Sequence, residues 1–146
     1  MIPLQSELFA SAGSGELFLL ARLLFGGVLA FMGMNHFTNT ADMVGYAQFK
    51  GLPAPKLSVV GSGGLLLFAG AGIAVGAFPV VSGFALGLFL LLSGVTMHDF
   101  WSMDDPEERQ NEMTSFLKNL FGAGGAFAFA ALGAVAWPYS VGLALF

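Results

Sequence analysis

Four long apolar stretches dominate this chain of 146 residues and leave little room for a soluble fold. They cover residues 17–37, 57–78, 80–100 and 117–137. Each has about 20 residues, which at ~1.5 Å of rise per residue lets a helix cross the hydrocarbon core of a bilayer. The charged side chains that interrupt them are Arg22, Asp99 and Lys118. The pattern predicts an all-α membrane protein, folded as one four-transmembrane-helix antiparallel bundle.

The composition favours a membrane location. Hydrophobic residues make up 56% of the chain and charged residues 10%, and the mean hydropathy is +0.80, whereas about a quarter of the residues in a soluble domain are charged. We therefore expect a multi-pass protein of the cell membrane whose main partner is the lipid bilayer. The chain has no cysteine and no basic cluster, so disulfides, thiolate metal sites and nucleic-acid partners are not expected.

Capping residues, glycines and prolines divide the apolar stretches into helices. The expected transmembrane helices are at about 16–37, 57–78 and 80–101, with a fourth that starts at 106 or 115 and ends at 137. A short amphipathic helix near residues 42–50 is expected to lie in the membrane interface between the first two spans.

Two connections have recognisable sequences. The link Gly76-Ala-Phe-Pro79 is so short that it predicts an antiparallel hairpin of the second and third spans. The string Asp104-Asp105-Pro106 is typical of a helix start, with an acidic cap and proline in the first turn. A helical extension over residues 106–116 is therefore expected to lead into the fourth span.

The distribution of basic residues predicts the orientation of the chain. Alternating spans place both termini on one side of the membrane and both long connections on the other. Lys50, Lys56, Arg109 and Lys118 lie on the connection side, against Arg22 near the side of the termini. By the positive-inside rule the connections are cytoplasmic and the termini lie outside.

Small residues recur at four-residue spacing within the spans, as in Gly72 and Gly76 or Gly83 and Gly87. Such ladders let helix backbones approach closely. Packing inside one bundle explains them most simply, and a homo-oligomer is the alternative that they leave open.

The polar residues in or beside the spans gather at one predicted depth. They are Asn35, His36, His98, Asp99, Trp101 and Lys118. Polar side chains inside a membrane bundle usually face its interior or a wet cavity. We expect the two histidines, Asp99 and Lys118 to converge there, because imidazoles beside a carboxylate can shuttle protons or hydrogen-bond the head of an apolar carbonyl ligand.

Each of these side chains also has a structural explanation. A histidine at a helix end can hydrogen-bond terminal carbonyl groups or lipid headgroups. Asp99 needs a cation in an apolar layer, and an Asp99–Lys118 ion pair is as good an interpretation as a catalytic pair. A metal or haem held between His36 and His98 is disfavoured, because the sequence provides no third strong ligand.

Arg22 is a second candidate for ligand binding, about four helical turns before His36. In one interpretation it extends to the nearby headgroups, assisted by Glu16. In the other it hydrogen-bonds Ser82, which lies at a comparable depth in the third span.

Several strings occur in the order found in one family of membrane proteins. Arg22-Leu-Leu-Phe-Gly26, Phe31-Met-Gly-Met-Asn-His-Phe37 and Gly51-Leu-Pro-Ala-Pro55, before a glycine-rich second span, together resemble the DoxX family of small four-helix proteins. His98-Asp-Phe-Trp101, followed by Gln110-Asn111 and Phe116-Leu-Lys-Asn119, is similar to one branch of that family. The resemblance covers residues 16 to 136.

The resemblance implies a link with redox enzymes. Members are associated with thiosulfate:quinone oxidoreductase and quinol-oxidase preparations and with membrane oxidoreductase complexes, whereas related folds include surfeit-four cargo receptors, which are not enzymes. The first hypothesis is a quinone-interacting subunit with His36, His98 and Asp99 near the quinone head. It requires a redox partner subunit that carries the electron cofactor. The others are a non-enzymatic binder or transporter of a lipid-like molecule and a structural or assembly subunit of a larger complex.

Overall fold

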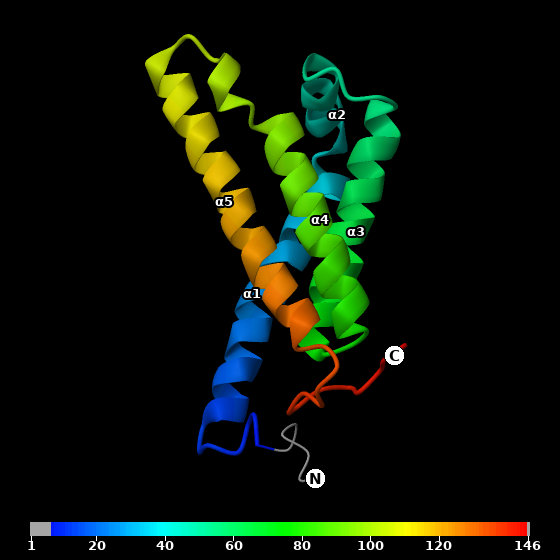
Figure 1. Cartoon of the computed structure of the whole chain (residues 1–146). Coiled ribbons are helices and arrows are strands. Elements are labelled where there is room, and N and C mark those ends of the chain that lie inside the picture. The colour runs from blue at the N-terminus through cyan, green and yellow to red at the C-terminus, as the bar shows by residue number, and fades with distance from the viewer. Residues whose placement is uncertain (1–6, 146) are drawn as a thin grey trace.

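The computed structural model of the chain describes residues 7–145, and the regular elements in that range are helices (Figure 1). They are α1 (Ser14–Thr38), α2 (Thr40–Phe49), α3 (Pro55–Val75), α4 (Pro79–Met97), the short 3-10 helix η2 (Phe100–Ser102) and α5 (Pro106–Ala131). Three of the predicted spans thus match α1, α3 and α4 closely, and the predicted interfacial helix is α2.

The helix ends follow from local sequence. Pro55, Pro79 and Pro106 each stand in the first turn of a helix, where the missing N–H group breaks no hydrogen bond. The Asp105 carboxylate caps α5 by accepting from the backbone N–H groups of Glu107 and Glu108 at 3.0 and 2.9 Å. These acidic residues also suit the positive end of the helix dipole.

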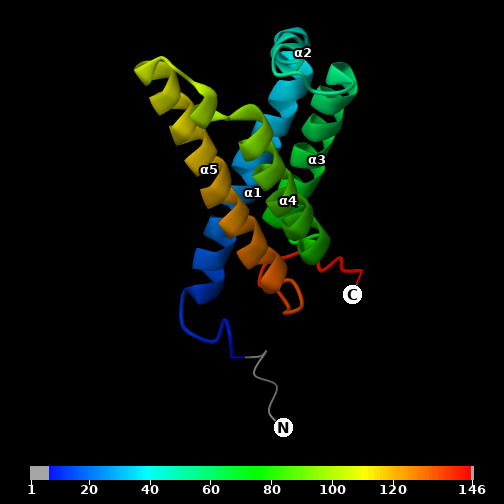
Figure 2. The same cartoon turned by 45° about the horizontal axis from the view of Figure 1, so that its top comes forward.

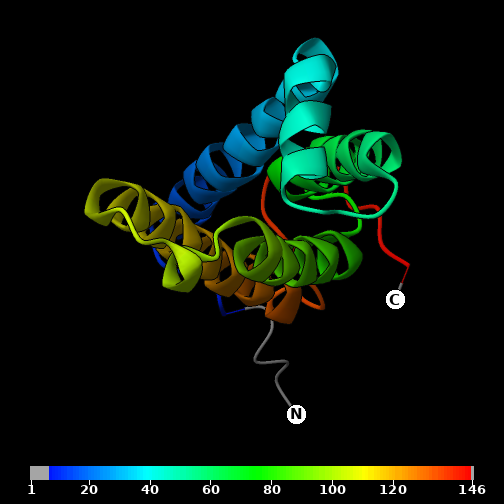
Figure 3. The same ribbon diagram turned by 90° about the horizontal axis from the view of Figure 1, so that it is seen from above.

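The helices run up and down and fall into two close pairs, α1 with α3 and α4 with α5 (Figure 1). The hairpin between α3 and α4 joins the pairs, as the sequence predicts. Its sharp turn needs a left-handed residue at Gly76, whose φ is 73°. Figure 2 shows α5 leaning away from α2 and α3 at the end where α2 and η2 lie. Seen from that end, α2 lies across the ends of α1 and α3 (Figure 3).

Glycines hold α1 directly against α3. A Cβ atom built at Gly26 would lie 2.3 Å from the carbonyl oxygen of Gly70, and one at Gly33 would lie 2.5 Å from the backbone nitrogen of Leu67. Real Cβ atoms essentially never come closer than 3.0 Å to such atoms. The two backbones are therefore in contact along a seam that only glycine permits, as is common between membrane helices.

Many large apolar side chains point outward, away from the buried core. Phe31, Phe68 and Phe121 are 71%, 77% and 86% exposed, which in water would make a surface prone to aggregation. In a bilayer the same surface contacts lipid. By length and composition Ser14–Thr38, Pro55–Val75 and Pro79–Ser102 are three candidate membrane spans. α5 is long enough but less apolar, and its crossing stays a prediction.

The predicted end of the fourth helix at residue 137 is wrong, because α5 ends at Ala131. The Trp137 indole folds back and donates to the carbonyl oxygen of Leu132 at 2.8 Å, which caps the helix end. The following residues, 138–145, run across the α3–α4 hairpin, where Phe78 N–H donates to Leu143 O at 2.7 Å. We call residues 132–145 the C-terminal strap.

Candidate functional site

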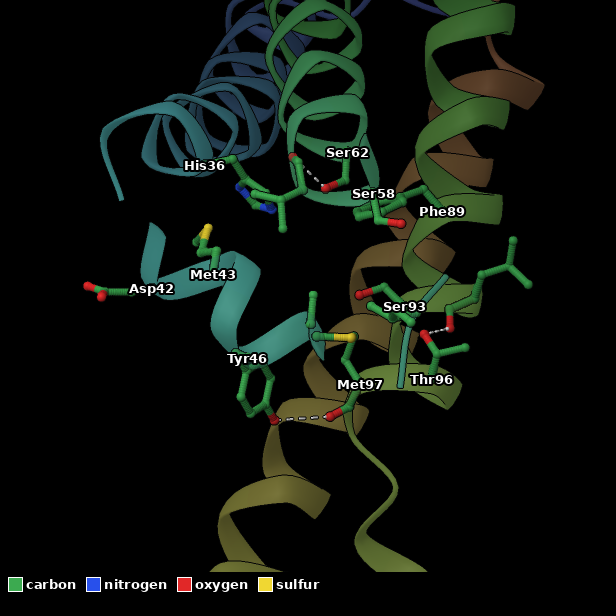
Figure 4. Close-up of a pocket in the computed structure, with 14 residues that line it drawn as sticks. His36, Asp42, Met43, Tyr46, Ser58, Ser62, Phe89, Ser93, Thr96 and Met97 are labelled. Carbon is green, nitrogen blue, oxygen red and sulfur yellow. Dashed lines mark hydrogen bonds between the residues drawn. The ribbon is translucent and has the colours of Figure 1, made fainter. Parts of the chain in front are cut away.

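A cavity of about 600 Å³ lies at the α2 end of the bundle, between α2, α3 and α4 (Figure 4). It is lined by His36, Asp42, Met43, Tyr46, Ala47, Leu52, Ser58, Val59, Ser62, Phe89, Leu92, Ser93, Thr96 and Met97. Its walls are mainly apolar, with one imidazole and a few hydroxyl groups placed among them. Binding sites for small apolar molecules have this size and composition.

His36 enters the cavity wall from α1, and glycine makes room for it. Its Nδ1 atom lies 2.9 Å from the carbonyl oxygen of Met32, one turn earlier. A Cβ atom built at Gly63 of α3 would lie 2.6 Å from the His36 Cβ. The absence of a side chain at Gly63 therefore allows His36 to lie directly against α3 at the edge of the cavity.

The end of α2 is tied to the end of α4 by side chains. The Lys50 ammonium group bonds to the Asp99 carboxylate at 2.5 Å, with the Lys50 side chain only 7% exposed. Ser102 also donates to Asp99, at 2.6 Å, and the Tyr46 hydroxyl donates to the Met97 carbonyl oxygen at 3.3 Å. Of these contacts, the Tyr46–Met97 bond joins two residues of the cavity lining and spans one side of the cavity (Figure 4), and the Lys50 ammonium group lies 5.7 Å from the centroid of the Tyr46 ring.

The predicted Asp99–Lys118 pair is therefore wrong, since the cation at Asp99 is Lys50 and Lys118 is exposed. Burial, the largest single influence, lowers the pKa of Lys50, but the hydrogen bond to Asp99 and the charge interactions with Tyr46, Asp99 and Glu112 together outweigh it, so the pKa is raised. Burial raises the pKa of Tyr46, and the negative charge of Glu112 acts in the same direction. Lys50 thus stays charged and Tyr46 stays protonated at neutral pH.

His98 faces a different partner from His36. Its Nδ1 lies 2.9 Å from a carboxylate oxygen of Glu112 on α5, and it is not among the residues that line the cavity. Within residues 7–145 no hydrogen bond joins any two of His36, His98, Asp99 and Lys118. The direct partners in the structure are thus Lys50 for Asp99 and Glu112 for His98, and the wider convergence of the four side chains stays a prediction.

Asn35 and Trp101 lie at the same end but outside the cavity lining. Asn35 is exposed and accepts a hydrogen bond from the amide of Asn39. Trp101 is half exposed and packs edge-on against Phe116, with ring centroids 5.8 Å apart. Any contact of these two residues with a ligand stays a prediction.

Arg22 lies at the opposite end of the bundle, where the C-terminal strap covers it completely. Its Nη2 donates to the carbonyl oxygen of Tyr139 at 2.9 Å, and its guanidinium carbon lies 5.4 Å from the centroid of the Trp137 ring. Glu16 bonds instead to the Tyr139 hydroxyl, at 2.8 Å. These contacts agree with neither interpretation, since Arg22 bonds neither to headgroups nor to Ser82. They could not be predicted, because the sequence gives no sign that residues after 131 fold back.

Sequence reasoning missed four polar residues at this end of the bundle, which are Lys50, Tyr46, Ser93 and Glu112. From the sequence, Lys50 and Glu112 were only charged residues in the connections between spans. Tyr46 was only an apolar residue of the interfacial helix. A signal for Lys50 does exist, because a lysine at the end of an interfacial helix lies at the depth where the third span ends. Ser93 had no signal, since a lone serine in an apolar span usually bonds its own helix backbone.

A model of the DoxX family matches residues 17–99, more than half of the chain. The chain belongs to the DoxX family. The match runs from α1 to the second residue after the end of α4, and so includes His36, the cavity lining and Asp99. The helix α5 lies beyond it, with Glu112, Lys118 and the C-terminal strap. No curated protein and no solved structure matches the chain.

In this DoxX protein the matched region is also the part that builds the cavity. All 14 lining residues fall between His36 and Met97, and the match covers that whole interval. The cavity is thus a feature of the family region of this chain, whereas the bond between His98 and Glu112 adds a contact from α5.

Proposed function

We propose that this DoxX protein binds a lipid-soluble molecule of the quinone class in the cavity beneath α2, as the membrane subunit of a redox complex. The observation that carries the proposal is a mainly apolar cavity with an imidazole and hydroxyl groups, at the end of a bundle whose outer surface suits lipid. A substituted ring with two oxygen atoms matches such a lining better than a uniformly apolar chain does.

The size and chemistry of the cavity fit a quinone head. About 600 Å³ lies within the range of roughly 300–1,000 Å³ found for small-molecule sites. Phe89, Leu92 and Val59 supply apolar contact, while His36 and Ser93 come from helices on different sides of the cavity (Figure 4). An isoprenoid tail would find the exposed apolar surface of α4 outside, where Leu92 is 66% exposed.

The redox part of the proposal requires a second subunit. Within residues 7–145 no group of three or more His, Asp or Glu side chains is placed to hold a metal ion, and the chain has no cysteine. An electron carrier on a partner subunit would therefore exchange electrons with the quinone. If no such partner exists, the same cavity serves the alternative function, which is binding or transport of a lipid-like molecule.

A matched pair of glycine variants tests whether the cavity is the binding site. Gly63→Ala places a methyl group against His36, whereas a Cβ atom at Gly61 in the same helix meets nothing within 4 Å. Binding of a short-chain alkyl benzoquinone to protein in nanodiscs is measured for both, with empty nanodiscs as the blank. We expect Gly61→Ala to bind like the natural protein and Gly63→Ala to lose about tenfold or more in affinity.

Two results would contradict the proposal. One is quinone uptake by the natural protein no greater than that of empty nanodiscs. The other is equal affinity in the two glycine variants when both are folded, as judged by circular dichroism, because the ligand would then lie away from His36.

A further inference from the structure

The hydroxyl groups around the cavity have little left to donate. A serine or threonine hydroxyl carries one proton and two lone pairs. In three of the lining residues that proton goes to a backbone carbonyl: Ser58 to Pro53 at 2.8 Å, Ser62 to Val59 at 3.0 Å and Thr96 to Leu92 at 2.8 Å. These side chains therefore present lone pairs to anything in the cavity.

His36 also presents a lone pair, rather than a proton, to the cavity. The Met32 carbonyl oxygen can only accept, so the hydrogen bond at 2.9 Å requires the proton of the neutral ring to be on Nδ1. Nε2 is then left with a lone pair and no proton. A neutral His36 thus offers a hydrogen-bond acceptor to a ligand hydroxyl group.

The remaining polar groups add one donor. The Tyr46 proton is used on the Met97 carbonyl oxygen, and the Asp42 carboxylate points away from the other lining side chains (Figure 4). Ser93 differs, because its oxygen accepts from the Asn119 amide at 3.3 Å and keeps its own proton free. The side chains around the cavity therefore present several acceptors and the single free hydroxyl proton of Ser93.

We infer that the cavity selects ligands that carry hydroxyl groups, so that it binds the reduced, hydroquinone form of a quinone more tightly than the oxidised form. The inference rests on the proposed function for its ligand class. A hydroquinone has two O–H donors to match these acceptors, whereas the carbonyl oxygens of a quinone meet lone pairs everywhere except at Ser93. One net hydrogen bond of this kind changes affinity by roughly tenfold.

Three probes that share one substituted ring differ in the hydrogen bonds that they can donate. They are a short-chain alkyl hydroquinone, the corresponding quinone and the hydroquinone dimethyl ether, which has no donor and does not change redox state. Their dissociation constants are measured without oxygen on the protein in nanodiscs. We expect the hydroquinone to bind about tenfold more tightly than either of the other two.

Two variants give opposite expected effects. His36→Leu removes an acceptor and should weaken hydroquinone binding about tenfold while changing quinone binding little. Ser93→Ala removes the free donor and should weaken quinone binding more than hydroquinone binding. A general loss of folding lowers both affinities together, so it does not produce this crossed pattern.

The outcomes distinguish this inference from the proposed function. If the quinone or the dimethyl ether binds as tightly as the hydroquinone, the selection for hydroxyl groups is refuted and the quinone site survives. If none of the three probes binds above the level of empty nanodiscs, the proposed function fails as well.

Discussion

Adding one methyl group to Gly26 should separate α1 from α3. A Cβ atom there would lie 2.3 Å from the Gly70 carbonyl oxygen and 2.7 Å from the backbone nitrogen of Ala74. Ordinary contact begins at 3.4 Å, so the two backbones must move apart by 3.4 minus 2.3, or about 1.1 Å. Both obstacles are backbone atoms, so no flexible side chain can turn away to relieve the clash.

The expected loss of stability follows from that displacement. A gap of about 0.5–1 Å already forfeits a quarter to a half of the dispersion energy of the atoms facing it, and overpacked positions typically cost about 1–3 kcal/mol. We expect Gly26→Ala to lose about 2–3 kcal/mol of unfolding free energy, because Gly33 and Gly70 lie on the same seam and lose contact with it.

The neighbouring residue supplies the control. A Cβ atom at Gly27 meets nothing within 4 Å, and alanine favours the helix over glycine by up to ~1 kcal/mol. Unfolding of both variants in detergent micelles is followed by circular dichroism as denaturing detergent is added. Gly27→Ala should match or exceed the natural protein. Equal stability of Gly26→Ala and Gly27→Ala would refute the direct backbone contact between α1 and α3 at Gly26.

Three further predictions concern the contacts between α2 and α4, the strap and the orientation. Lys50→Met removes the cation at Asp99, so the backbone amides of α2 should exchange hydrogen faster, as measured by mass spectrometry. Lys118→Met is the control and should leave the exchange of α2 unchanged. Equal exchange in both variants would contradict the role of Lys50 in holding α2 against α4. Trp137→Phe deletes the indole donor to Leu132 and should cost about 1–3 kcal/mol of unfolding free energy in the same detergent titration, while an unchanged midpoint would mean that the cap is unimportant. A reporter active only in the cytoplasm, fused after residue 146, should give no signal, and a strong signal would reverse the predicted orientation.

Hydropathy and turn chemistry predicted most of the helical architecture. The spans at α1, α3 and α4 follow from apolar length, and the hairpin follows from a four-residue link with Gly76 and Pro79. The end of α5 could not be predicted, because residues 132–137 are as apolar as a helix in a membrane. The contacts that stabilise this helix end are not visible in the hydropathy: Gly133 packs closely against Val80 of α4, and the Trp137 indole donates to the Leu132 carbonyl oxygen.

The sequence predicted at which end of the bundle the candidate site lies, but not which side chains form pairs there. The sequence predicted that His36, His98 and Asp99 lie at one end of the bundle, and in the structure all three lie at the α2 end. It could not decide whether Lys50 or Lys118 meets Asp99, because both lysines lie on the connection side and the choice depends on how α2 lies over the bundle. The cavity depends on how the helices are arranged around it, and no single residue in the sequence indicates that arrangement.

The central claim is that a quinone-class molecule occupies the cavity at His36. Native mass spectrometry of protein released gently from its own membrane tests it most directly, with Gly63→Ala and Gly61→Ala prepared alongside. The account predicts a bound species with the mass of a quinone or hydroquinone on the natural protein and on Gly61→Ala, and its loss from Gly63→Ala. A phospholipid or no ligand on the natural protein, or equal quinone retention by both folded variants, would contradict it.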